Sequence, residues 1–208
     1  MPTIERVNLT YCLGYSKSNI GDFISFNDKS QGSPPPTTAR LGMTFGLKGK
    51  IIDDYDIEFK NIREVSDLLV GRDENGEVYL QEDLLGDIDL QKHIFSGTPD
   101  KNITINKGIE ITFFDVYSHR KGEYIDLAGK IVLKTKGYSI NFTNGFLMIC
   151  KSLYLDDPLI IEDIFSYLDF EYNYAVEIGL KSDARDNISY EEYRVSVKNI
   201  DKLVSKLF

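Results

Sequence analysis

The chain has 208 residues, of which 42% are apolar and 27% charged, a composition typical of a globular protein and not of a disordered one. Its net charge of −9 opposes binding to the phosphates of nucleic acids. No apolar run approaches the roughly 18 residues of a membrane span, and the start, MPTIERVNLTYCLG, lacks the basic-then-apolar order of a signal peptide. We therefore expect a cytoplasmic protein that binds neither nucleic acid nor membrane.

The first third of the chain predicts several strands and then a helix. Aromatic, apolar and β-branched residues dominate the predicted strands, which cover residues 7–13, 22–26, 41–45 and 48–59. The run NIREVSDLLVG at 61–71 predicts a helix, because its apolar residues recur at intervals of three and four positions. These residues are Ile62, Val65, Leu68 and Leu69, and Gly71 follows them as a helix stop.

The stretch VGRDENGEVYLQEDLL combines features of a calcium loop with those of a plain turn. Asp73, Asn75 and Glu82 fall at positions 3, 5 and 12 of an EF-hand loop, but Gly71 stands at position 1, where an aspartate is needed. The letters DENG before an alternating run are also typical of a hairpin. We favour the hairpin, and Asp73, Asn75 and Glu82 are the metal-ligand candidates if the loop binds calcium.

The second half of the chain is richer in strands. Lys-Gly pairs and Asn144-Gly145 indicate turns between the earlier strands, and the last two strands are expected to pair antiparallel. The predicted strands cover residues 108–118, 124–136, 138–155, 171–181 and 190–197.

Two further helices complete the predicted elements. DDPLIIEDIFSYLD at 156–169 has Asp157 as N-cap and Pro158 at the first helical position, and 199–208 is a short amphipathic helix. The sequence thus predicts an α+β fold, mostly antiparallel β-sheet with about three short helices. We expect one domain over 1–208, with a junction between subdomains near 96–102 as the alternative.

Negative charge is concentrated in the second quarter of the chain. Residues 51–100 hold 14 acidic and 4 basic side chains, a net charge of −10 that exceeds the −9 of the whole chain. If these carboxylates converge, they form a surface that attracts a basic protein, with two tyrosines as aromatic anchors; otherwise they serve solubility alone. The predicted partner-binding residues are Asp53, Asp54, Tyr55, Asp56, Glu58, Asp73, Glu74, Glu77, Tyr79, Glu82, Asp83, Asp87 and Asp89.

Catalytic motifs are missing from the sequence. Neither of the two histidines has a metal-type partner three or four residues away, and His93 is expected to be a half-buried packing residue. Cys12 and Cys150 both lie in apolar runs, which predicts two buried, reduced thiols. We therefore expect no catalytic residue and no cofactor.

The function that these observations favour is non-catalytic binding. The chain would be an inhibitor or immunity-type protein that neutralises a basic partner, such as a nuclease-like toxin or a defence enzyme. One alternative is a metal-dependent enzyme that uses an Asp/Glu cluster, either Asp53, Asp54, Asp56 and Glu58 or Asp73 with Glu82. The other is a structural or assembly subunit.

Overall fold

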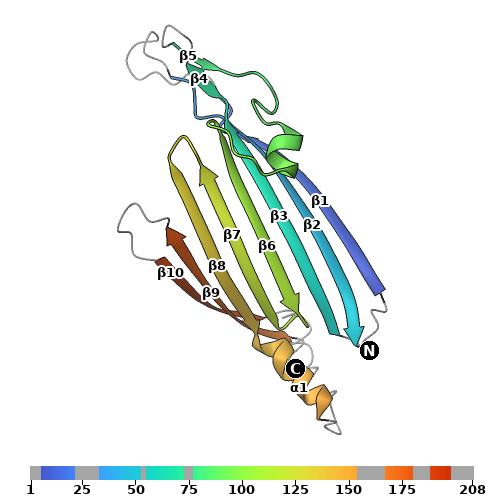
Figure 1. The fold of residues 1–208 in the computed structure, drawn as a ribbon. Coiled ribbons are helices and arrows are strands. Elements are labelled where there is room, and N and C mark those ends of the chain that lie inside the picture. The colour runs from blue at the N-terminus through green and yellow to red at the C-terminus, as the bar shows by residue number, and fades with distance from the viewer. Residues whose placement is uncertain are drawn as a thin grey trace, which may run out of the picture.

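Most of the described residues belong to one long antiparallel sheet (Figure 1). A computed structural model of the chain describes residues 6–21, 33–52, 55–72, 77–153, 167–179 and 188–197. Every neighbouring pair of strands in the sheet is antiparallel. The spatial order is β1 (Arg6–Ser18), β2 (Thr38–Ile52), β3 (Tyr55–Leu68), β6 (Ile103–Phe113), β7 (Tyr117–Asp126), β8 (Ile131–Asn141), β9 (Leu168–Gly179) and β10 (Ile188–Val197).

Three smaller pieces accompany the sheet. A two-stranded ribbon of β4 (Val70–Arg72) and β5 (Val78–Leu80) extends beyond β3 (Figure 1). One turn of π-helix, η2 (Leu90–Phe95), and one α-helix, α1 (Phe142–Ser152), are the helices of the described residues. The predicted β-rich fold is confirmed, and the described residues contain two helices where about three were expected for the chain. Neither helix in this part of the chain is long and apolar enough to cross a membrane.

Several predicted strands coincide with observed ones. Residues 7–13 lie in β1 and 41–45 in β2, and β9 pairs antiparallel with β10 as expected. The predicted strand 22–26, the helix 199–208 and most of the helix 156–169 lie outside the described residues. At the end of that last helix, Leu168 and Asp169 belong to β9 instead.

The predicted helix at 61–71 is wrong, because these residues continue β3 up to Leu68. β3 is hydrogen-bonded on both sides, to β2 and to β6, along almost its whole length. Val65 is buried between its cross-strand neighbours, while Ile62 and Leu68 point to the opposite, exposed side. Pairing on both edges supplies the backbone hydrogen bonds that a helix would otherwise provide, and this outweighs the apolar periodicity.

The predicted turns are also misplaced. Lys121-Gly122 and Lys136-Gly137 lie inside β7 and β8, and the chain turns at 114–116 and 127–130 instead. Asn144-Gly145 is not a hairpin turn but part of α1, because the side chain of Asn141 accepts the backbone N–H of Asn144 at 2.9 Å and caps the helix. The predicted strand 138–155 therefore ends at Asn141.

The large sheet has two chemically different faces. Side chains alternate along each strand, so that Leu41, Val65 and Ile105, which are opposite one another in register, share one side that we call the core face. We call the other side the glycine face, because six of the sheet's glycines occupy positions whose side chains would point to that side. They are Gly14, Gly42, Gly46, Gly108, Gly122 and Gly137.

Among the described residues, the hydrophobic core covers one end of the core face. Residues 81–102, which we call the cap, fold over the ends of β2, β3 and β6 where η2 lies (Figure 1). Arg63 Nη1 donates to the carbonyl oxygen of Ile94 at 2.8 Å, and Tyr15 Oη donates to that of Leu84 at 2.7 Å. The buried core residues are Ala39, Leu41, Val65, Leu69, Ile88, Ile94, Ile103 and Ile105. Away from the cap, core-face side chains of β1 and β2 such as Leu9 and Phe45 are exposed.

Candidate functional site

The predicted acidic residues divide between the two ends of β3. Asp56 and Glu58 lie at its start, whereas the later acidic residues lie beyond its end, where the backbone N–H of Asp87 donates to Oδ2 of Asp67 at 2.6 Å. The strand between Glu58 and Asp67 is about 30 Å long. The expected convergence on one surface therefore does not occur among the described carboxylates.

The two carboxylates at the start of β3 are paired within the sheet. Asp56 lies 3.2 Å from Lys48 Nζ, and Glu58 lies 3.0 Å from Lys60 Nζ. Burial alone would lower the pKa of Lys60, but its hydrogen bonds to Glu58 and Glu110 outweigh burial and raise that pKa. Much of the charge of Asp56 and Glu58 is thus balanced inside the protein.

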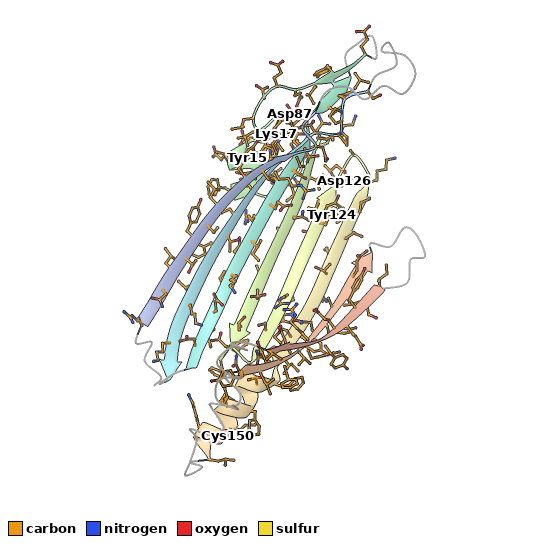
Figure 2. The ribbon with its side chains drawn as sticks, turned by 180° about the vertical axis from the view of Figure 1, so that it is seen from behind. Tyr15, Lys17, Asp87, Tyr124, Asp126 and Cys150 are labelled. Atoms are coloured by element: carbon orange, nitrogen blue, oxygen red, sulfur yellow. The ribbon has the colours of Figure 1, made fainter. Side chains whose placement is uncertain are left out.

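The carboxylates beyond the end of β3 are accessible. We call Glu77, Glu82, Asp83, Asp87 and Asp89 the acidic group, and all five are exposed, as is Tyr79 on β5. Asp89 also caps η2 by accepting the backbone N–H of Lys92 at 2.8 Å. Figure 2 shows Asp87 at the same end of the molecule as Tyr15 and Lys17.

Several predicted residues cannot be placed. Asp53, Asp54, Asp73, Glu74 and Asn75 lie outside the described residues, and so does the side chain of Tyr55. β4 pairs with β5 around residues 73–76, as the predicted hairpin requires. Within the described part of the chain, no three His, Cys, Asp or Glu side chains are grouped so that they could hold a metal ion. The metal site of Asp73, Asn75 and Glu82 stays a prediction.

His93 is a structural residue of the cap. It is 1% exposed, so it is fully buried and not half-buried as predicted. Its Nδ1 accepts the backbone N–H of Asp89 at 2.8 Å, so the ring proton is on Nε2, which lies 3.1 Å from Oδ2 of Asp100. Both ring nitrogens are occupied, which leaves neither to act on a substrate. Hydrogen bonds from Lys92 and then His93 lower the pKa of Asp100.

The two cysteines differ in their surroundings. Both are free, and Cys150 in α1 is buried as predicted. The prediction is wrong for Cys12, which is exposed on β1. β1 is the outermost strand, and no described residue covers its glycine face at this position.

Among the described residues, no strand pairs with the outer side of β1. Within the described residues β1 pairs only with β2, over 13 residues without a register shift. Residues 7–16 contain neither a charge nor a proline, although proteins commonly use both to protect sheet edges. The core-face side chains of this strand are exposed and apolar: Val7, Leu9, Tyr11, Leu13 and Tyr15. Such an edge is suited to pairing with another strand.

β10 forms the opposite edge of the sheet. Within the described residues it pairs only with β9, again without a register shift. It has no proline, and its core-face residues Tyr193, Val195 and Val197 are exposed, Tyr193 by 77%. Tyr193 is also the last ring of an aromatic row that crosses five strands. The ring-centroid distances are 6.5 Å for Phe113–Tyr117, 6.3 Å for Tyr117–Tyr138, 6.0 Å for Tyr138–Tyr172 and 4.9 Å for Tyr172–Tyr193.

The two outer strand pairs of the sheet differ in the sign of their formal charge, although Lys48 is paired with Asp56 and Asp115, and Glu171 and Glu192 with Arg194. β1 and β2 together contain five basic and no acidic residues, whereas β9 and β10 contain five acidic residues and one basic residue. The basic residues are Arg6, Lys17, Arg40, Lys48 and Lys50. The acidic residues are Asp169, Glu171, Glu177, Glu191 and Glu192, with Arg194 as the exception. Surfaces of opposite sign attract and help to select the matching partner.

Comparison with known proteins adds no relative to this picture. No protein-family model, curated protein or solved structure matches the chain. The chain's own geometry is therefore the basis for assigning a function. Neither edge was predicted, although the alternation of apolar residues over 7–15 is visible in the sequence. Whether a strand lies at an edge depends on the pairing order, which a list of strands does not contain.

Proposed function

We propose that the protein is an assembly subunit that associates with copies of itself through the two edges of its large sheet. The observation that supports this proposal most strongly is that β1 and β10, each paired on one side only among the described residues, lie at opposite ends of one sheet and differ in the sign of their charge. Two copies can bring a basic β1 edge against an acidic β10 edge, whereas two β1 edges or two β10 edges repel each other. We place this assembly in the cytoplasm, where free thiols such as Cys12 stay reduced.

Charge reversal tests this proposal. The variant Glu191→Lys/Glu192→Lys makes both edges basic, and Arg6→Glu/Lys17→Glu makes β1 acidic like β10. Wild-type protein should form oligomers in light scattering at low salt, and each variant alone should associate at least about tenfold more weakly. Mixing the two variants should restore the oligomers, because each edge then meets an edge of opposite charge.

A matched control separates edge charge from total charge. Glu82→Lys/Asp83→Lys changes the net charge by the same amount as Glu191→Lys/Glu192→Lys, but in the acidic group, and it should leave association unchanged. A wild-type protein that is monomeric at every concentration would refute the proposal. So would equal weakening by the control, or a mixture that does not recover.

A second candidate function is binding of a basic partner protein through the acidic group, as an inhibitor or immunity-type protein. The exposure of all five carboxylates at one end of the molecule favours it. It requires a basic protein that wild-type bait retains from native lysate at low salt, and that Glu82→Lys/Asp83→Lys bait loses. Retention by both baits, or by neither, would contradict it.

A further inference from the structure

The direction of the two edge strands determines how neighbouring copies can meet. Seven antiparallel pairings separate β1 from β10, so these two strands run in opposite directions. A second copy in the same orientation therefore presents its β1 antiparallel to the first copy's β10. The antiparallel hydrogen-bond pattern of the sheet could continue across the contact if the second copy is rotated so that the sheet's twist also continues.

The faces also match in this arrangement. Register pairs connect Val7 on β1, strand by strand, to Tyr193 on β10, so both residues belong to the core face. In that row Val7 of a neighbouring copy would lie opposite Tyr193, with Leu9 diagonal to Tyr193, Val195 diagonal to Val7 and Tyr11 further along the same face. All five side chains are exposed in the isolated chain. Cross-strand pairs of aromatic and aliphatic residues stabilise antiparallel sheets.

We infer that β10 of one copy pairs antiparallel with β1 of the next copy, so that successive copies form one continuous twisted sheet. This inference rests on the proposed self-association and specifies its geometry. The contact uses two different strands and is therefore heterologous, and each added copy leaves a new β1 or β10 edge free. Such contacts produce a closed ring or an open filament of more than two copies.

Cys12 offers a direct test, because it is exposed on the glycine face of β1. The same register pairs connect Cys12 to Ile188 in one row across the sheet. Residues opposite each other in antiparallel strands have Cα atoms about 4.5–5.5 Å apart, which is within the range of a disulfide. A cysteine on the glycine face of β10 should therefore crosslink to Cys12 of the adjacent copy.

The experiment introduces one cysteine at a time into β10 of the full-length chain. Ile188→Cys, Tyr190→Cys and Glu192→Cys place it on the glycine face, and the matched controls Ser189→Cys, Glu191→Cys and Tyr193→Cys place it on the core face. A second background, Cys12→Ser/Thr10→Cys, moves the β1 thiol by two residues to allow for a shifted register. After mild oxidation, peptide mapping identifies each disulfide.

We expect intermolecular disulfides between β1 and β10 from the glycine-face set and none from the core-face set, and oligomers larger than dimers. Disulfides between two Cys12 residues or between two β10 cysteines would show pairing of like edges and overturn the inference. Equal crosslinking of the glycine-face and core-face cysteines would also overturn the inference. So would association that stops at a dimer. Oligomers without any β1–β10 crosslink would refute this geometry while leaving self-association intact, whereas a monomer would refute self-association itself.

Discussion

Gly122 and Gly137 mark close approach between strands, not the turns that the sequence suggested. A Cβ atom on Gly137 would lie 2.6 Å from the backbone oxygen of Tyr174 in β9, and one on Gly122 would lie 2.6 Å from Thr135 Oγ1 in β8. The turn at 114–116 instead uses Phe114 and Asp115 with φ of 59° and 53°. A Lys-Gly pair carries no local sign of which role its glycine has, because the close neighbour comes from a different strand.

Gly137→Ala should destabilise the protein by about 1–3 kcal/mol, because the added methyl group forces β8 and β9 apart. Gly14→Ala is the matched control, since nothing lies within 4 Å of a Cβ there, and it should change the free energy of unfolding by less than about 0.5 kcal/mol. Urea denaturation at low protein concentration measures both values. Equal effects of the two substitutions would contradict the role assigned to Gly137.

His93→Ala should lower the free energy of unfolding by roughly 2–4 kcal/mol, because it leaves the backbone N–H of Asp89 without an acceptor and opens a cavity in the cap. His93→Asn should recover part of the loss, since its side-chain oxygen can accept the same N–H. Chemical denaturation of the three proteins provides the comparison. A loss for His93→Ala of under about 0.5 kcal/mol would show that the cap does not depend on this residue.

At the scale of elements, strand composition was predictable, but most of the pairing was not, the antiparallel pair of β9 and β10 being the exception. The alternating residues of β1 and the aromatic residues of β9 identify these strands in the sequence. The second half of β3 was predicted as a helix because its apolar periodicity carries no sign of the two strands, β2 and β6, that pair with it. α1 was missed because its N-cap, Asn141, also ends a strand.

An ion-pair network ties three neighbouring strands together on the glycine face. Glu110 on β6 lies 3.2 Å from Lys60 Nζ on β3 and 2.5 Å from Arg120 Nε on β7. Burial alone would raise the pKa of Glu110, but its hydrogen bonds to Arg120 and Lys60 outweigh burial and lower that pKa. The folded state therefore favours the charged carboxylate more than the unfolded state does.

Acid should weaken the wild-type fold partly through this network. The contribution of Glu110 is complete above its ordinary pKa of 4.5 and is lost as the pH falls through its lowered pKa in the folded state. Glu110→Gln should therefore reduce the loss of unfolding free energy between about pH 5 and pH 3 by on the order of 1 kcal/mol. Glu82→Gln, in the exposed acidic group, is the control and should leave the acid dependence as in wild type. Parallel curves for wild type and Glu110→Gln would contradict the expectation.

At the scale of the whole molecule, the acidic segment of the sequence does not become one acidic surface. Residues 51–100 contain the whole of β3, so their described acidic residues lie at both ends of that long strand. Closeness in sequence therefore did not predict closeness in space. The exposed acidic group alone retains the predicted accessibility. The charge contrast between the two edges, which the proposed function uses, is visible only after residues are sorted by strand order.

Association also predicts that stability depends on protein concentration. Because copies that bind only in the folded state stabilise it by mass action, a hundredfold increase in concentration adds up to about 2.7 kcal/mol. The Tm of wild type should rise by several degrees, on the order of 2–4 °C per kcal/mol for a chain of this size. The Tm of Glu191→Lys/Glu192→Lys should stay constant in the same differential scanning series. A constant Tm for wild type would count against edge association.

The order of strands in the sheet has a consequence for synthesis on the ribosome. β1, β2 and β3 follow one another directly and can pair as soon as Leu68 has left the exit tunnel, but the next neighbour of β3 is β6, which is complete only at Phe113. Until β6 is complete, the nascent chain exposes the edge of β3 that later pairs with β6, as well as the outer edge of β1. Translation through the cap is thus the period in which the growing chain is most open to pairing with the wrong strand.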